Sequence, residues 1–298
     1  MSTEAPTTSE AAAPAPGEAA IKKTLGIGFW ICIGWLLVMV FVAVFATRLP
    51  IPDPKFNFIK PGQAGPSKGP SAAHWFGTDK DARDVFARTM YGARVSLTVG
   101  FIAIAFGMFV GGTLGILAGF FRGWIDRIFS FMFLVLLSFP SLVLAIMLTA
   151  LLDRKLFTIS MILGVLAVAP VGRLARATTM QYADREFVIA ARSLGAKNKR
   201  IIVRELLPNV AIPMSALALL GMAVAIVAEG GLAFLGLSVE RSITWGGMIQ
   251  LGSDSSKTLQ NQPWIAFFPI GVLFLTVFAL NFAGDRVRTY FDVKEISL

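Results

Sequence analysis

The polar insert 173–208 carries the side chains best suited to specific recognition in an otherwise apolar chain. Eight of its residues are basic: Arg173, Arg176, Arg185, Arg192, Lys197, Lys199, Arg200 and Arg204. Lys and Arg can pair with the acidic groups of a partner protein. They also collect in loops that face the cytoplasm, so an ordinary solvated basic loop that only fixes membrane topology is the alternative.

The order of residues in this insert predicts a helix, a glycine turn and a second helix over about 197–207. Asp184 is a suitable N-cap, Glu186 suits the first turn, and Gly195 is a suitable helix stop. Ala190 and Ala191 leave a surface of small side chains between them. Such a surface can lie close inside the groove of a partner protein.

The side chains that most enzymes use are scarce. Cys32 is the only cysteine and His74 the only histidine, which excludes an intrachain disulfide and argues against a zinc site or a Ser-His-Asp triad. The chain has no Gly-x4-Gly-Lys-Ser/Thr phosphate-binding loop. We therefore predict no catalytic residue, no metal site and no nucleotide bound by this chain.

Glu229 is the one acidic residue deep inside an apolar run, and Gly230 and Gly231 follow it. A carboxylate in hydrocarbon costs several kcal/mol unless it is paired or hydrated. It is either a pathway or gating residue or a buried acid that ties its helix to neighbouring backbone. The two glycines are expected to break the helix and to offer amide groups to the carboxylate.

The composition explains why so few polar groups stand out. Of 298 residues, 55% are hydrophobic and 15% charged, and the mean hydropathy is +0.70. Globular domains carry about 25% charged residues, so these values indicate a polytopic membrane protein. In a soluble protein the net charge of +9 would suggest nucleic acid. Here it is explained by cytoplasmic loops and anionic lipid, and no nucleic-acid partner is predicted.

The apolar runs predict an all-α polytopic protein with six transmembrane helices. They cover about 25–46, 96–121, 128–151, 157–171, 211–234 and 264–283. Segment 79–94 has the composition of an interfacial amphipathic helix, and 122–127 that of a charged turn. Pro140 should kink the third run. A secretory signal is the alternative for the first run, but the long tail before it favours an uncleaved anchor.

Four parts follow along the chain. We predict a disordered cytoplasmic tail (1–21), a first transmembrane helix with an external loop (22–94), a five-helix core containing the cytoplasmic insert (95–285), and a cytoplasmic tail (286–298). Six spans place both termini on one side. The basic insert and the pair Lys22-Lys23 put that side in the cytoplasm, although the longer loop 47–94 also holds eight basic residues.

Glycines recur every four residues in the second apolar run, at Gly107, Gly111, Gly115 and Gly119. On a helix this spacing forms one stripe, along which a neighbouring helix can approach closely. The alternative is that glycine is simply common in membrane helices. Close helix packing is the predicted role, and it names no function by itself.

The insert resembles the signature of binding-protein-dependent ABC importer permeases, Glu-Ala-Ala-x3-Gly-x9-Ile-x-Leu-Pro. This chain keeps the two alanines, Gly195, Leu207 and Pro208, and it differs at Ile189 and Glu205. Further motifs are similar to the C-type permease subunit of dipeptide and oligopeptide importers. They are Phe76–Asp79, Arg83–Val85, Tyr91–Leu97, Phe234–Leu237, Ser242–Gly246, Pro263-Trp264, Asn281, Gly284-Asp285 and Arg288.

This resemblance implies a type I ABC importer permease fold in the bacterial inner or plasma membrane. It also implies a second homologous permease, two ATPase domains or subunits that use ATP and Mg²⁺, and an extracytoplasmic substrate-binding protein, which His74 and Trp75 of the external loop could touch. The coupling helix would comprise Glu186, Ala190, Ala191, Arg192, Ser193, Leu194, Gly195 and Ala196. Arg286 and Arg288 fit snorkelling at a helix end better than ATPase contact.

The resemblance leaves the cargo open. Short peptides are the first expectation, and nickel, glutathione or another small solute are alternatives within the same architecture. A stand-alone secondary transporter is the alternative class, and it predicts more intramembrane charges and inverted repeats than this sequence has. A membrane enzyme is disfavoured by the shortage of His, Cys and clustered carboxylates.

Overall fold

The structure is a computed structural model that describes residues 25–59 and 65–296, so the predicted tail 1–21 lies outside the described residues. Over these ranges the chain is helical, with an isolated β-bridge between Thr78 and Asp84 and no strand. The helices are α1 (Gly26–Phe45), α2 (Val85–Phe121), α3 (Gly123–Ser138), α4 (Ser141–Leu151), α5 (Leu156–Ala183), α6 (Glu186–Ser193), α7 (Asn198–Arg200), the π-helix η1 (Ile201–Leu206), α8 (Leu207–Phe234), α9 (Trp245–Ser253), α10 (Ser256–Asn261) and α11 (Trp264–Ile296).

Five helical stretches in the described residues are long and apolar enough to cross a membrane. They are α1, α2, α5, the continuous stretch from α7 to α8, and α11. The pair α3 and α4 makes a sixth if the two are counted as one bent span. The predicted all-α, multi-span fold is confirmed.

Three helices extend beyond the apolar runs that predicted them. Segment 79–94 is not a separate interfacial helix, because α2 begins at Val85 and continues into the second span. Helix α5 continues to Ala183, and α11 continues through most of the predicted C-terminal tail. The polar insert is therefore helical at both ends and contributes to two spans. Hydropathy marks where a helix meets lipid, whereas backbone hydrogen bonding continues past that point.

The third predicted span is broken rather than kinked. Helix α3 begins at Gly123, inside the predicted charged turn, and ends at Ser138. Phe139 and Pro140 have extended ψ angles of 134° and 117°, and α3 and α4 meet at 83°. A residue before proline is driven out of the α region and proline has no amide donor, so the helix stops at this pair.

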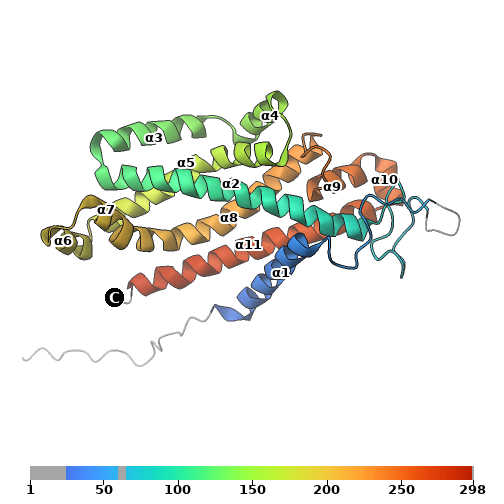
Figure 1. Ribbon diagram of the computed structural model, residues 1–298, viewed down its shortest axis with the longest axis horizontal. Coiled ribbons are helices and arrows are strands. Elements are labelled where there is room, and N and C mark those ends of the chain that lie inside the picture. The colour runs from blue at the N-terminus through green and yellow to red at the C-terminus, as the bar shows by residue number, and fades with distance from the viewer. Residues whose placement is uncertain (1–24, 60–64, 297–298) are drawn as a thin grey trace, which may run out of the picture.

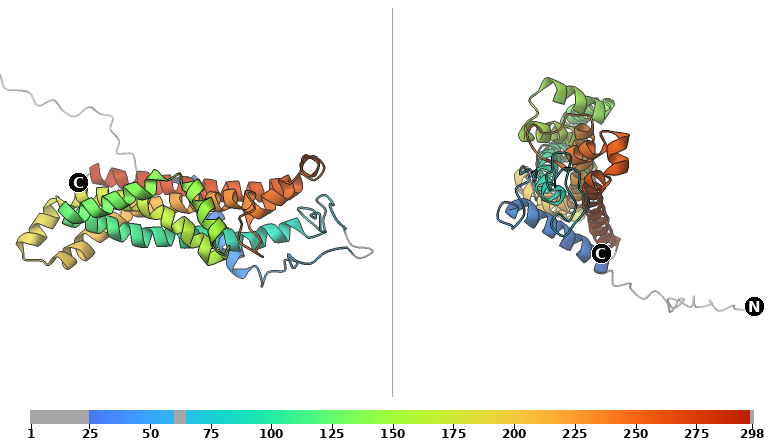
Figure 2. Two further views of the ribbon diagram at one scale, coloured as in Figure 1. Left: turned by 90° about the horizontal axis from the view of Figure 1, so that it is seen from above. Right: turned by 90° about the vertical axis from the view of Figure 1, so that its right-hand side faces the viewer.

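The long helices lie side by side, as Figures 1 and 2 show. Figure 1 places helix α6 and the end of α11 at one end of the molecule, and the start of α1 nearer its middle. The described residues between α1 and α2 (46–59 and 65–84) lie towards the other end, where α9 and α10 are. One buried cluster joins α1, α2, α8, α9 and α11, and it includes Met39, Leu97, Ile226, Trp245 and Leu280.

Candidate functional site

Helix α6 is linked to α5 by only two residues, Asp184 and Arg185. Arg185 occupies the N-cap position with extended backbone and forms no side-chain capping bond with any residue that the structure describes. The Asp184 carboxylate instead accepts a hydrogen bond of 2.7 Å from the guanidinium of Arg122, at the corner between α2 and α3. The prediction that Asp184 caps the helix is therefore wrong, because an arginine distant in sequence holds its carboxylate.

Helix α6 ends in a Schellman motif at Gly195. The Gly195 amide donates to the Arg192 carbonyl and the Ala196 amide to the Ala191 carbonyl, each at 3.0 Å. Gly195 has a φ of +78°, which glycine adopts at little cost and most residues do not. The helix thus stops at the point where the sequence predicted a glycine stop.

Helix α6 buries one side and exposes the other. Val188 is fully buried against Phe120, Ile201 and Leu206, which come from α2 and η1. On the other side Ile189 is 56% exposed, and Leu194, just past the helix, is 88% exposed. Most of the predicted coupling residues are exposed (Glu186, Ala190, Arg192, Ser193, Leu194 and Gly195), while Ala191 and Ala196 are half-buried.

The basic residues of the insert do not all face outward. Arg176 points to Asp126 of α3, and its Nη2 atom donates to the Asp126 Oδ2 atom at 2.7 Å. A second bond joins Arg176 Nε to the other carboxylate oxygen, which also accepts from Ser130 at 3.0 Å. Four others surround a shallow surface hollow beside Val203: Lys197, Lys199, Arg200 and Arg204.

The glycine stripe of α2 faces α5. A Cβ atom built on Gly107 would lie 2.6 Å from the Ala167 Cβ, and one on Gly119 would lie 2.7 Å from the Arg176 carbonyl oxygen. Equivalent atoms on Gly111 and Gly115 would collide with the backbone carbonyl oxygens of α5. The two helix backbones therefore approach closely along the whole stripe.

Glu229 lies inside this chain and does not reach its surface. Glu229 is only 1% exposed. Helix α8 continues through Gly230 and Gly231 to Phe234, so the predicted helix break is wrong. Tertiary packing retains the helix at these glycines. Ser238 donates to the carboxylate at 3.3 Å, and the hydroxyls of Ser96 and Thr244 are close by. The acid thus links α8 to α2 and to the segment before α9.

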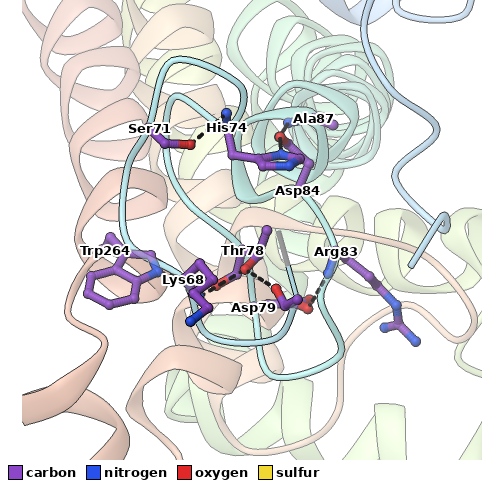
Figure 3. Close-up of polar contacts among 10 residues, drawn as sticks. Lys68, Ser71, His74, Thr78, Asp79, Arg83, Asp84, Ala87 and Trp264 are labelled. Carbon is purple, nitrogen blue, oxygen red and sulfur yellow. Dashed lines mark hydrogen bonds and ion pairs between the residues drawn. The ribbon is translucent and has the colours of Figure 1, made fainter. Parts of the chain in front are cut away.

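The segment before α2 is held by polar contacts that the sequence analysis missed (Figure 3). The Asp84 carboxylate accepts from the Ala87 amide and lies against His74 Nδ1, each at 2.7 Å. The Thr78 carbonyl accepts from the Trp264 indole at 3.2 Å. An Asp before an apolar run is a capping signal, so Asp84 was detectable from sequence. Trp75 is 66% exposed, while His74 is buried.

Comparisons with known proteins agree with this architecture. Residues 111–295 match the family model described as "Binding-protein-dependent transport system inner membrane component". The chain is 36% identical to the dipeptide transport system permease protein DppC of Alkalihalophilus pseudofirmus, covering 92% of this chain and 86% of the relative. It is 32% identical to the oligopeptide transport system permease protein OppC of Bacillus subtilis, covering 87% and 84%.

Two further comparisons bear on cargo and fold. The chain is 33% identical to the glutathione transport system permease protein GsiD of Pectobacterium atrosepticum, covering 76% of this chain and 75% of the relative. An inward-facing structure of the MetNI methionine ABC transporter matches with a TM-score of 0.55 at 18% identity, covering 68% of this chain and 96% of that one. The fold is therefore that of an ABC importer permease, and the chain belongs to the family of binding-protein-dependent transport system inner membrane components.

Proposed function

We propose that this chain is the C-type permease subunit of an ATP-driven importer of short peptides. It would form the pathway with a second permease chain, and two ATPase domains or subunits would bind ATP and Mg²⁺. The main support for this proposal is helix α6, which places exposed apolar and small side chains at one end of the helical bundle. A partner that pushes on this helix would act directly on the continuous stretch from α7 to α8.

The proposed function also implies an orientation of the chain in the membrane. The end that holds α6 and the end of α11 would face the cytoplasm, where the ATPases lie (Figure 1). The basic residues near α6 favour this orientation. The opposite end, with residues 65–84, α9 and α10, would face the extracytoplasmic binding protein.

Short peptides are the proposed cargo because relatives named for dipeptide and oligopeptide transport match over most of the chain. Glutathione is a second candidate, since a relative named for glutathione transport is 33% identical. Glutathione is itself a small peptide with free carboxylates, so both candidates belong to one chemical class.

In the first test, the chain is expressed in its native organism and purified together with the proteins bound to it. We expect a second permease and an ATPase to co-purify, and ATP-dependent uptake after reconstitution with the cognate binding protein. Binding-protein-stimulated ATPase activity over dipeptides, longer peptides, glutathione and nickel then identifies the cargo. Absence of any ATPase partner contradicts the proposed function, and stimulation by nickel alone contradicts the proposed cargo.

A further inference from the structure

Two arginine–carboxylate pairs connect α3 and the corner before it to α5 and to the joint between α5 and α6. We propose that Asp126–Arg176 and Arg122–Asp184 are pairs of positioning residues that make α3 move with the coupling helix α6. The inference rests on the proposed function, because it assigns a path by which a partner's push on α6 reaches the broken span α3–α4.

The Asp126–Arg176 pair is the stronger of the two contacts. Arg176 bonds both carboxylate oxygens of Asp126, and the two side chains are only 31% and 19% exposed. Two-pronged arginine–carboxylate pairs fix orientation as well as distance. Partial burial reduces screening by water and salt, so this contact persists where an exposed pair would exchange with solvent.

Packing next to this pair adds a second attachment between α3 and α5. Phe133 of α3 is 1% exposed, and its ring lies over Gly172, one helical turn before Arg176. A Cβ atom on Gly172 would collide with this ring. Helix α3 is thus held to α5 by an aromatic ring in a glycine gap and by the ion pair beside it.

The second pair joins the corner before α3 to the residue before α6. Arg122 has a φ of +54°, a conformation that costs a non-glycine residue energy, and its guanidinium reaches Asp184 at 2.7 Å. The side chains are 45% and 69% exposed, so this pair alone adds little stability. Its value is positional, because Asp184 is one of two residues between α5 and α6.

The buried side of α6 packs against the ends of α2 and η1. Val188 packs with Phe120, next to the α2–α3 corner, and with Ile201 and Leu206 of η1. The Arg192 guanidinium also lies 5.8 Å from the centre of the Phe120 ring. The ends of α2, α5 and η1, together with α3 and α6, therefore share contacts. The chain leaves this group of contacts at the Phe139–Pro140 break, where α3 ends and α4 begins.

The functional test compares variants of the reconstituted complex. The readout is the amount of substrate transported per ATP hydrolysed. Arg176→Gln and Asp126→Asn should lower this ratio several-fold, because α6 would then move without α3. Arg127→Gln is the matched control, since Arg127 is exposed on α3 beside Asp126 and forms no ion pair among the described residues. The exchange Asp126→Arg with Arg176→Asp should recover part of the loss.

The outcomes separate the two proposals. If the wild-type complex shows no ATP-dependent uptake, the proposed function is contradicted. Normal wild-type uptake, with Arg176→Gln no more uncoupled than Arg127→Gln, contradicts only the positioning role. An assembled charge-exchange variant that recovers nothing contradicts the pairing of Asp126 with Arg176.

A distance measurement requires no ion-pair variant and applies even if Arg176→Gln fails to assemble. Spin labels are placed through Ile189→Cys on α6 and Phe131→Cys on α3, both exposed, in a Cys32→Ala background. The distance between the labels should be the same in the nucleotide-free complex and in the complex trapped with ATP. A change in this distance overturns the proposal. The distance from α6 to a label at Leu142 of α4 has no bearing on this result.

Discussion

Gly246 of α9 lies directly against Gly230 of α8. A Cβ atom on Gly246 would stand 2.5 Å from the Gly230 Cα and 2.8 Å from the Ala233 Cβ. The neighbouring Trp245 is fully buried, and its indole donates to the Thr89 carbonyl of α2 at 2.9 Å. Helix α9 is thus wedged between two membrane-spanning helices rather than resting on their ends.

Gly246→Ala should separate α9 from α8. The added methyl group has no free volume, and overpacking of this kind costs about 1–3 kcal/mol. We expect a fall of several degrees in the apparent melting temperature of the purified complex. Gly271→Ala in α11 is the control, since nothing in the part of the chain that the structure describes lies within 4 Å of a Cβ there. An equal melting temperature for both variants would show that α9 is not wedged as described.

Adjacent glycines of α2 offer a sharper comparison. A Cβ on Gly111 would overlap the Val168 carbonyl oxygen of α5, whereas one on Gly112 meets, within 25–59 and 65–296, only the Met214 methyl group, at 3.8 Å. Gly111→Ala should therefore destabilise the chain by about 1–3 kcal/mol through overpacking. Gly112→Ala should be neutral or slightly stabilising, because alanine is the better helix former. Thermal unfolding of the two variants side by side measures the difference.

The spacing of these glycines predicted a packing stripe, because a four-residue repeat lies on one helix face whatever the partner is. Sequence could not identify α5 as that partner, since this depends on which spans pack together. Apolar runs located the spans for the same local reason. They could not show that Pro140 breaks the third span instead of kinking it, because neighbouring contacts decide how far a proline helix bends.

Contacts between distant residues account for the other errors. Asp184 has the local features of an N-cap, yet Arg122, 62 positions earlier in the chain, holds its carboxylate. Gly230 and Gly231 look like a helix break, yet packing between α8 and α9 keeps the helix continuous. Local preferences are worth about 1 kcal/mol each, which a tertiary contact of similar size can reverse.

Glu229 should act through hydrogen bonds rather than through exposure to a pathway. Its carboxyl group accepts from Ser238 and is enclosed by α2, α8 and the segment before α9. Glu229→Gln keeps the size and an acceptor, so the complex should assemble and transport. Glu229→Ala removes one acceptor of the Ser238 hydroxyl, which retains its contact with Thr244, and opens a cavity. The cavity costs about 2–5 kcal/mol and should reduce the yield of assembled complex. Severe loss of uptake by a fully assembled Gln variant would instead favour a direct role of the charge.

Asp84 should stabilise the start of α2 through two contacts. It caps the helix by accepting from the Ala87 amide, and its other oxygen meets His74. Asp84→Ala loses both, and loss of an N-cap alone costs about 0.5–2 kcal/mol. Asp84→Asn retains the cap and should melt at an intermediate temperature. Asp81→Ala is the control, because the one side-chain contact of Asp81 with the described residues is a surface ion pair with Arg83 in the same segment. Equal melting of the Asp84 and Asp81 alanine variants would contradict this capping role.

The conformation of Gly195 should be more important for coupling than its small size. No atom of the described residues lies within 4 Å of a Cβ built there, but φ is +78°, a conformation that costs a β-branched residue about 1–2 kcal/mol. Gly195→Val should open the turn after α6, displace Leu194 and Ala196, and leave an assembled complex with little transport or substrate-stimulated ATPase activity. Gly195→Asn adds comparable bulk but tolerates this φ, so it should retain most coupled transport. If both variants transport like the wild type, α6 is not the coupling helix. If both fail equally, bulk at the partner's surface rather than turn geometry limits this position.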